Sequence, residues 1–366
     1  MYILCRGGEG SCNPRAGGAE RTIHEVCTRL IKKDYLVTIL TGGWKGCRRE
    51  EHLDGITIYR YGRSLGPHLV LPIFIFKYKF DIIVNDLGHA VPWISSAVLG
   101  KENLVFFHHL HARSVFGQVN PLLAWIITAI EKLYFLIYHN APFVTESSTS
   151  HNDLLNLGID KKNIIIIPPG VDRELFKPTK KTPYPSMVYF GGMRRYKRPV
   201  ESIYLLKNLQ RKFPDIKLMI IGTGPEKENM EKLSVDMKLQ NSITFMGRLT
   251  NKNLTETVAS SWINVHSSIT EGWGFSIIEA AAAGTPTVAY EVPGVVDAIE
   301  NGINGIKVRD GDRNELKRAA IEILSTAEKW SESSVRSAEK YSWNRTAEMW
   351  EKLIRDLDSD KICLLH

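Results

Sequence analysis

The feature that most constrains the fold of this chain is a regular alternation of short apolar runs with segments of helical length. The runs are rich in Ile, Val, Leu and Phe, and the segments between them are long enough for a helix. Strands that alternate with helices in this way form parallel sheets with helices packed against them, so we predict an α/β protein. The expected strands are 2–5, 36–41, 56–61, 82–85, 104–107, 143–145, 164–167, 187–190, 217–221, 243–246, 263–266, 287–290 and 306–308.

The length of the chain and one proline-rich stretch indicate two domains. A chain of 366 residues is long enough for two domains of roughly 150–200 residues each. Polar and proline residues dominate 177–185, at the midpoint, as is typical of a linker. In open parallel sheets ligands bind beyond the carboxyl ends of the strands, so we expect the site in the cleft where the two domains face each other. The predicted parts are a doubly wound domain over 1–178, a linker over 179–186, a second doubly wound domain over 187–342, and a C-terminal helix and tail over 343–366.

Composition and charge limit the classes of protein that fit. The chain is 43% hydrophobic and 24% charged, as ordinary globular proteins are. Its five cysteines are scattered and form no CxxC pair, which favours a reducing compartment and argues against a disulfide framework or a zinc cluster. No signal peptide and no apolar run of about 18 residues is visible, so we expect a cytoplasmic protein without a spanning helix. The net charge of +7 suits an anionic substrate or surface; nucleic acid is not an expected partner, because no nucleic-acid motif is present.

Two apolar segments, 69–80 and 121–138, leave two interpretations open. The first interleaves Leu, Ile and Phe with Lys77 and Lys79, and the second is apolar except for Glu131, Lys132 and a few small polar residues. Both segments fit buried core helices. They also fit an interfacial surface that docks peripherally on the cytoplasmic face of a membrane, where the positive net charge would assist near anionic lipids.

The stretch 266–286 carries the strongest functional signal. Glu271 precedes a turn with two glycines, a helix is predicted to begin at residue 275, and Glu279 lies one turn inside it. Glycines let the backbone approach a ligand closely, and free N–H groups at a helix N-terminus favour an anion such as a phosphate. A carboxylate would repel that phosphate, so we expect Glu271 and Glu279 to accept hydrogen bonds from hydroxyl groups on either side of it. A phosphate between two hydroxyl-rich groups describes a nucleotide-sugar. Its expected contacts in the turn are Gly272, Trp273, Gly274 and Phe275.

This pattern resembles the E-x7-E signature of the retaining glycosyltransferases of family four. The resemblance covers essentially the whole chain and is tightest over 164–308. It implies the GT-B fold, with two Rossmann-like domains facing across a cleft and the last helix, here within 343–366, crossing back onto the first domain. It also implies transfer of a hexose from a UDP- or GDP-linked sugar to a glycan or lipid-linked acceptor, without a cofactor or a metal ion. In such enzymes Glu279 would bind the ribose hydroxyls and Glu271 the sugar hydroxyls.

Two segments of the first half resemble site elements of the same family. Gly17 and Gly18, in the loop 14–20 after the first strand, match its acceptor-side glycine loop. His108 follows directly after the predicted strand 104–107, and a histidine at that place contacts the donor sugar in the family. Its position directly after the strand favours His108, with His109 and His111 as alternatives. A metal site at this histidine-rich tip is disfavoured, because no carboxylate within it completes a ligand set.

Basic and glycine residues of the second half match the donor side of the family, with one departure. The family places an Arg directly after a glycine and a Lys five residues later; Lys197 fits the Lys, but Gly192 stands in the place of the Arg. Either Arg194 or Arg195 then reaches the diphosphate, or donor binding is weaker than is typical. We favour Arg195, together with Lys197, as the cations that neutralise the leaving diphosphate. Further donor-side turns are expected at Gly222, Gly224 and Arg248.

Two other functions remain as alternatives. A nicotinamide-dependent dehydrogenase would also be doubly wound, but it needs a G-x-G-x-x-G turn. Lys227 stands where the third glycine would follow Gly222 and Gly224. The other alternative is a non-catalytic homologue that binds a nucleotide-sugar or glycan as a partner subunit, which the departure at Gly192 favours.

Overall fold

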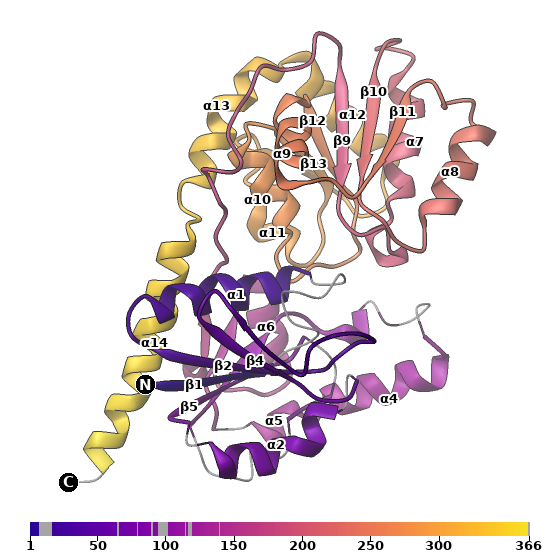
Figure 1. Ribbon diagram of the computed structural model, residues 1–366. Coiled ribbons are helices and arrows are strands. Elements are labelled where there is room, and N and C mark those ends of the chain that lie inside the picture. The colour runs from indigo at the N-terminus through magenta and orange to yellow at the C-terminus, as the bar shows by residue number, and fades with distance from the viewer. Residues whose placement is uncertain are drawn as a thin grey trace. The chain divides into compact units, whose positions relative to one another are not determined.

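The computed structural model divides the chain into two compact units (Figure 1). The first unit comprises Met1–Gly170 and Trp343–His366, and the second comprises Val171–Ser342. Within these limits the structure describes residues 1–6, 17–63, 66–78, 80–88, 91–93, 102–113, 115, 119–138 and 140–364. The predicted α/β class is confirmed, because each unit is a parallel or mostly parallel sheet covered by helices.

The first unit is built on a sheet that, within its described residues, has eight strands in the order β3-β4-β2-β1-β5-β6-β7-β8. The strands are β1 (Tyr2–Arg6), β2 (Leu36–Thr41), β3 (Glu50–Leu53), β4 (Ile56–Arg60), β5 (Ile82–Asp86), β6 (Glu102–Phe107), β7 (Phe143–Thr145) and β8 (Ile164–Ile166). Neighbouring strands pair in parallel, except that β3 and β4 are antiparallel. The helices are α1 (Gly18–Ile31), α2 (Gly66–Lys77), α4 (Pro121–Glu131), α5 (Tyr134–Ile137), α6 (Ser148–Asn156) and α14 (Trp343–Leu364), with 3-10 turns η1 (His111–Arg113) and η2 (Lys161–Asn163).

Strand β3 was not predicted from the apolar runs. Its sequence is Glu-Glu-His-Leu, and each of these residues is exposed or half-buried at the edge of the sheet. The turn that joins β3 to β4 contains Asp54 at φ 51° and Gly55 at φ 82°. A two-residue hairpin turn of the Asp-Gly type requires such positive values, so this dipeptide was the signal for the missed hairpin.

Helices cover both faces of the first sheet. Successive residues of a strand point to opposite faces, so Ile3 and Cys5 of β1 pack with α1 and α14, whereas Leu4 packs with α2 and α5. Helix α14 contributes Trp350 and Ile354 to the first of these two cores and lies against α1. The C-terminal segment therefore belongs to the first unit.

The second unit is built on a wholly parallel sheet, with six strands among its described residues in the order β11-β10-β9-β12-β13-β14. The strands are β9 (Ser186–Phe190), β10 (Lys217–Ile221), β11 (Ile243–Gly247), β12 (Ile263–His266), β13 (Thr287–Tyr290) and β14 (Gly305–Val308). The helices are α7 (Val200–Leu209), α8 (Lys227–Asp236), α9 (Asn251–Ser260), α10 (Phe275–Ala282), α11 (Val295–Ala298), α12 (Arg313–Ser325) and α13 (Ala327–Ala338), with the 3-10 turn η3 (Arg195–Lys197). The chain runs outward from β9 to β11 and then returns to the centre at β12. In open sheets of this kind ligands bind beyond the carboxyl ends of the two strands at such a switch point.

The boundary between the units differs from the predicted one. The first domain was predicted to end at residue 178, with a linker over 179–186, but the second unit begins at Val171. Phe176 is buried in the core of the second unit. Lys181 Nζ donates to Ser261 O at 2.8 Å and to Thr285 Oγ1 at 2.8 Å. The prediction was wrong because proline and polar residues are typical of linkers, whereas here these specific contacts pack the segment onto the second unit.

Candidate functional site

The two central strands of the second unit end in the loops that carry most of the predicted donor residues. Strands β9 and β12 lie side by side and parallel, so the loops that follow them leave from the same edge of the sheet. The loop after β9 holds the turn η3, and the loop after β12 leads through the double-glycine turn into α10. This edge is the switch point of the sheet, where we expect a ligand.

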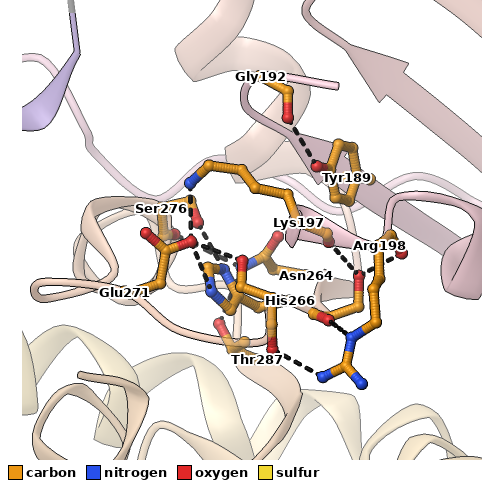
Figure 2. Close-up of polar contacts among 11 residues, drawn as sticks. Tyr189, Gly192, Lys197, Arg198, Asn264, His266, Glu271, Ser276 and Thr287 are labelled. Carbon is orange, nitrogen blue, oxygen red and sulfur yellow. Dashed lines mark hydrogen bonds and ion pairs between the residues drawn. The ribbon is translucent and has the colours of Figure 1, made fainter. Parts of the chain in front are cut away.

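A polar cluster joins these two loops around the carboxylate of Glu271 (Figure 2). Its Oε1 accepts hydrogen bonds from Lys197 Nζ at 2.7 Å and from Ser268 Oγ at 2.5 Å, and it lies 3.4 Å from His266 Nε2. Within the described residues the polar contacts of this carboxylate are all made by Oε1, so Oε2 has no protein partner. The structure thus brings the predicted Lys197 and Glu271 together, with one carboxylate oxygen left for a ligand.

Burial and ion pairing fix the charges of Lys197 and Glu271. Burial opposes the charge of Lys197, but the carboxylate of Glu271 outweighs it and raises the pKa of Lys197 above its ordinary value. Burial likewise opposes the charge of Glu271, yet the ammonium of Lys197 and the adjacent ring of His266 hold its pKa well below the usual range. Both groups therefore stay charged throughout the neutral pH range.

His266 is a site residue that the sequence analysis missed. It is the last residue of β12 and its side chain is buried. Nδ1 lies 3.0 Å from Ser276 Oγ in the first turn of α10, while Nε2 faces Glu271. The ring therefore connects the strand end, the acidic residue and the helix. Its signal was its place at the end of a strand, the same position that favoured His108 in the first half.

Arg198, directly after Lys197, holds the two loops together. Its backbone is left-handed, with φ 44°, a conformation that residues other than glycine rarely adopt. Nε donates to Ser267 O at 2.7 Å, and a terminal nitrogen donates to Ser268 O at 2.8 Å and pairs with Asp310. Ser267 Oγ in return donates to the carbonyls of Lys197 and Arg198 at 3.0 and 2.8 Å. This network fixes the backbone from which the side chain of Lys197 extends.

The double-glycine turn presents main-chain donors at the start of α10. Gly274 is the N-cap residue at φ 95°, and a Cβ there would lie 2.9 Å from a neighbouring isoleucine side chain. No carbonyl or side chain of the described residues accepts a hydrogen bond from the N–H groups of Gly272, Trp273 or Gly274. Together with the N-terminus of α10, which begins at Phe275, these groups provide the kind of anion site that the sequence predicts.

Two predicted donor residues of this segment have buried side chains. Trp273 packs edge-to-face against Tyr341, with 5.3 Å between the ring centroids, inside the core of the second unit. Its indole therefore stabilises the fold, and only its main chain can meet a donor. Glu279 is buried on α10, one turn beyond the glycine turn, and its contact with a ribose stays a prediction.

The turn after β10 packs directly on the loop after β9. A Cβ at Gly222 would lie 2.0 Å from Gly191 O, and a Cβ at Gly224 would lie 2.4 Å from Met193 O. Both glycines are therefore needed for the close approach of two protein loops, a requirement independent of any ligand. Arg248, after β11, donates from Nε at 3.3 Å to the threonine between these glycines. The three residues lie at the same edge of the sheet, and their contact with a nucleotide stays a prediction.

Gly192, which stands where the family pattern has an arginine, has space around it for a side chain. Its carbonyl accepts a hydrogen bond from Tyr189 Oη at 3.2 Å, and a Cβ added there would meet nothing closer than Arg194 Cγ at 4.0 Å. Arg194 and Arg195 are both exposed. The turn η3 begins at Arg195 and ends at Lys197, so the favoured arginine lies in the same turn as the lysine.

His108, directly after β6 in the first unit, lies between two buried carboxylates. Nε2 is 2.7 Å from Asp86 Oδ1, and Nδ1 is 3.2 Å from Glu146 Oε2. Burial opposes a charge on the ring, but the two carboxylates outweigh it and raise the pKa of His108 to about 10. Both ring nitrogens are thus used within the unit. Contact with a donor sugar stays a prediction, and it would require one of these hydrogen bonds to exchange.

The remaining predicted residues of the first unit have partners within that unit. The main-chain N–H of His111 donates to Glu131 Oε1 at 2.6 Å, and the ring of His109 lies 5.3 Å from that of His111. Gly17 N donates to a glutamate at 2.8 Å in the first turn of α1, which begins at Gly18. Residues 14–16 of the predicted acceptor loop lie outside the described residues. His108, Gly17 and Gly18 belong to the first unit, and all the other favoured site residues belong to the second.

Two protein-family models match this chain, one in each half. Residues 16–175 match the model described as glycosyltransferase family 4, and residues 171–340 match the model described as glycosyl transferases group 1. The second match contains the whole cluster around Glu271 and the helix α10 that follows it.

Relatives with known names and known structures extend the comparison. A protein of Arabidopsis thaliana that is one of the subunits of phosphatidylinositol N-acetylglucosaminyltransferase is 25% identical over 366 residues, which cover 92% of this chain and 78% of the relative. Sucrose-phosphate synthase from Thermosynechococcus elongatus has a similar structure, with a TM-score of 0.80 and 20% identity over 98% of this chain and 100% of that one. HepE of Anabaena, solved in complex with UDP-glucose, gives a TM-score of 0.75 and 15% identity over 97% of this chain and 100% of that one. These structures share the GT-B fold that the sequence predicts.

Proposed function

Because this chain belongs to glycosyltransferase family 4 and is therefore a glycosyltransferase, we propose that it moves a hexose from a UDP- or GDP-linked sugar to a glycan or lipid-linked acceptor. The dehydrogenase alternative is thereby set aside. We propose further that the reaction retains the configuration of the sugar and needs no metal ion. The observation that carries the proposal is the Lys197–Glu271 pair, which lies in the two loops that meet at the glycine turn.

In this proposal the donor diphosphate lies over the carboxyl ends of β9 and β12. Its oxygens would accept hydrogen bonds from the N–H groups of Gly272 to Gly274, for which the described residues offer no other acceptor. Lys197 and Arg195 would neutralise the negative charge that develops as the diphosphate leaves. Preorganised donors of this kind contribute about 3–4 kcal/mol each to the stability of a transition state. In a reaction without a metal ion, these two cations and the N–H groups together would stabilise the leaving diphosphate.

Glu271 and Glu279 are proposed to bind the hydroxyl groups on either side of the diphosphate. The protein contacts of the Glu271 carboxylate all go to Oε1, so Oε2 can accept a hydrogen bond from a sugar hydroxyl while the pair with Lys197 stays intact. Glu279 would accept hydrogen bonds from the ribose, as its place in the E-x7-E pattern implies. A carboxylate is suited to this contact because it accepts hydrogen bonds from hydroxyls and is repelled by the phosphate itself.

The acceptor class is proposed from the names of relatives. Phosphatidylinositol N-acetylglucosaminyltransferase is named for a lipid acceptor, and poly(glycerol-phosphate) alpha-glucosyltransferase of Bacillus subtilis is named for a polymer acceptor. We infer that this chain acts in the cytoplasm on a glycan or lipid-linked acceptor. Peripheral contact with an anionic membrane is part of the proposal, because a lipid-linked acceptor would be presented at that surface.

The test is donor turnover by the purified full chain. UDP- and GDP-linked hexoses are supplied one at a time together with glycan acceptors, detergent-solubilised lipid acceptors and a chelator, and release of the nucleoside diphosphate is measured. We expect one donor class to be consumed with the chelator present, and we expect Glu271→Gln and Glu279→Gln each to lower the rate by about 100-fold or more. Glu231→Gln, at an exposed carboxylate of α8, is the matched control and should leave the rate unchanged. Full activity in both site variants, or complete loss of activity on chelation, would overturn the proposal.

A second candidate is a non-catalytic homologue that binds a nucleotide-sugar or glycan as a partner subunit. Gly192 favours it, because the arginine that the family places there is missing. Equilibrium dialysis with isotope-labelled donors separates the two candidates. A donor that binds tightly and is neither transferred nor hydrolysed, with lipid and glycan acceptors both supplied, would support the non-catalytic homologue.

A further inference from the structure

Helix α2 of the first unit is apolar on the side that faces outward. Leu69, Ile73 and Phe76 are 80%, 71% and 78% exposed, and their spacing of four and three residues places them on one face of the helix. The opposite face packs in the core through Leu71, Phe74 and Ile75. A helix that is hydrophobic on every side is normally buried in a core or placed against a membrane. Helix α2 is buried on one side alone.

Helix α4 shows the reverse of the usual arrangement of a surface helix. Its buried residues are the small Ala124 and the acidic Glu131. Leu122 is 71% exposed and Trp125 is 66% exposed. Leu123 and Ile126 of the same helix are also exposed, as are Leu133 and Leu136 in and before α5. A carboxylate therefore points into the protein while the large apolar side chains point out of it.

The outward orientation of α4 is fixed by hydrogen bonds at its C-terminal end. There Glu131 accepts hydrogen bonds from the main-chain N–H groups of His111 at 2.6 Å and Ala112 at 2.9 Å. At the N-terminal end the helix is capped by the side chain of Asn120, which accepts a hydrogen bond from Leu122 N at 2.9 Å. The exposed apolar residues are thus held in place by the fold.

Helices α2, α4 and α5 lie on the same side of the first unit's sheet. All three pack against one hydrophobic cluster, to which α2 contributes Phe74, α4 contributes Ile130 and α5 contributes Tyr134, whereas α1 and α14 pack on the opposite face. Figure 1 shows α2 and α5 across the sheet from α1, with α4 beside them. We call their outward residues the α2–α4 face. It consists of Leu69, Ile73, Phe76, Leu122, Trp125 and Leu136.

The charges around the α2–α4 face suit an anionic surface. Within the described ranges 66–78 and 119–138 the one acidic residue is Glu131, which is buried, whereas Lys77 and Lys132 are exposed. Helix α4 has 11 residues, far fewer than the roughly 20 that a membrane-spanning helix needs. Among the described helices, none combines the length and the apolar character required to cross a membrane.

We propose that the protein docks on anionic lipid bilayers through the α2–α4 face. The apolar side chains would enter the boundary between headgroups and acyl chains, with Trp125 at the interface where tryptophan is enriched, and Lys77 and Lys132 against lipid phosphates. A second copy of the chain fits this face less well, because it would bring two sets of lysines together with no exposed carboxylate within these helices to pair them. This docking surface rests on the membrane contact in the proposed function and gives that contact its residues. All of these residues belong to the first unit.

The test is flotation of the full chain with lipid vesicles, without donor or acceptor. Vesicles of phosphatidylcholine alone are compared with vesicles that also contain phosphatidylglycerol. We expect wild type to float with the anionic vesicles and to do so less with the neutral ones. The double variants Leu69→Ser/Phe76→Ser and Leu122→Ser/Trp125→Ser should each lower the partition coefficient by about tenfold or more. Val235→Ser, at a 53% exposed position of α8 in the second unit, is the matched control and should float as wild type does.

A second measurement does not depend on the folding of these variants. Trp125 fluorescence should be quenched by brominated phosphatidylglycerol in the vesicles, and Trp125→Phe should lose that part of the quenching while it still floats. The proposal is overturned if wild type does not float with anionic vesicles, or if the double variants float as well as wild type does. It is also overturned if light scattering shows a dimer that the double variants convert to monomers, because a second copy then covers the face. Donor turnover needs no vesicle, so failure of docking leaves the proposed glycosyl transfer standing.

Discussion

Lys197 Nζ lies 2.7 Å from Glu271 Oε1, and this ion pair joins the loop after β9 to the loop after β12 at the switch point of the second sheet. The two side chains are 23% and 12% exposed, so water solvates neither charge fully and each depends on the other. Removing one partner of a buried pair commonly costs about 3–5 kcal/mol of stability. A cation that is already in place also needs no reorganisation when a diphosphate arrives, which is the condition for strong electrostatic catalysis.

Replacement of Lys197 should therefore impair both stability and turnover. We expect Lys197→Met to lower the rate of nucleoside diphosphate release by about 100- to 1000-fold, because the leaving group loses a preorganised cation. It should also lower the melting temperature, because Glu271 keeps a buried charge without its partner. The matched control is Lys227→Met on α8, whose lysine forms an exposed pair with Glu231 and should affect neither quantity.

A double variant separates the two effects of Lys197. In Lys197→Met/Glu271→Gln neither buried charge is left unpaired, so the melting temperature should recover toward that of wild type. Because Glu271→Gln alone already lowers turnover, the double variant is compared with that single variant, and we expect its turnover to be lower still. Equal turnover in the two would mean that Lys197 acts only through Glu271 and has no contact with the donor.

Gly192→Arg should strengthen donor binding. A Cβ at this position would meet nothing closer than Arg194 Cγ at 4.0 Å, so the backbone has room for a side chain. An added guanidinium at the place where the family carries an arginine would offer a planar pair of donors to the diphosphate. We expect the dissociation constant of the nucleoside diphosphate, measured by calorimetry, to fall about tenfold, since a charge-assisted hydrogen bond contributes roughly 1.5–3 kcal/mol.

Gly302→Arg is the matched control for Gly192→Arg in its charge change. Gly302 is exposed in the turn before β14, and a Cβ there would meet nothing within 4 Å, although its φ of 81° means that the substitution costs some stability. It should leave nucleotide affinity unchanged. Equal affinity for wild type and Gly192→Arg would mean that the neighbouring Arg194 or Arg195 already fills this role, or that the diphosphate binds elsewhere.

The fold was largely predictable because its strands are buried and apolar. Every predicted strand is confirmed with its ends within two residues of the expected ones, since parallel strands covered on both faces give continuous apolar runs. Strand β3 was missed because an edge strand need not be apolar, and its Glu-Glu-His-Leu sequence carries no such run. The unit boundary was misplaced because contacts such as those of Lys181 depend on the tertiary structure and leave no local pattern in the sequence.

The candidate site was predictable where a charged residue lies beside a glycine turn at the end of a predicted strand. Glu271 and Lys197 flank glycine turns after predicted strands, and the structure places them within hydrogen-bond distance. His266 and Arg198 were missed because their roles come from partners across the cluster, Ser276 for the first and main-chain carbonyls for the second. Trp273 was expected to meet the donor through its backbone N–H, and that contact stays a prediction; the packing of its indole in the core of the second unit was not foreseen.

Arg198 should act as a positioning residue for Lys197. Its guanidinium donates to the carbonyls of Ser267 and Ser268, an arrangement that the single nitrogen of a lysine reproduces poorly. We expect Arg198→Lys to lower kcat about tenfold and to change KM little, because the charge is kept and the geometry of the neighbouring lysine is loosened. Arg309→Lys, at an exposed arginine that pairs with the half-buried Asp312, is the matched control and should leave kcat unchanged. A change in KM with constant kcat would instead indicate that Arg198 contacts the donor itself.

His108 should make the stability of the first unit depend on pH. The carboxylates of Asp86 and Glu146 outweigh the effect of burial and raise the pKa of His108 from its ordinary 6.5 to about 10 in the folded protein. A group whose pKa is raised by folding stabilises the protein fully below its unfolded pKa, and this stabilisation is lost as the pH rises through the folded pKa. The contribution should thus be complete below about pH 6.5 and should decline by a few kcal/mol between there and about pH 10.

The measurement for His108 is the unfolding transition of the first unit, followed by calorimetry across this pH window. The difference in melting temperature between wild type and His108→Gln should be largest near pH 6 and should shrink steadily toward about pH 10, because the neutral variant lacks the titrating proton. His24→Gln, at a histidine that pairs with Asp54 near the surface of the same unit, controls for loss of a histidine as such. A difference that is constant with pH would show that folding does not raise the pKa of His108, which contradicts the prediction.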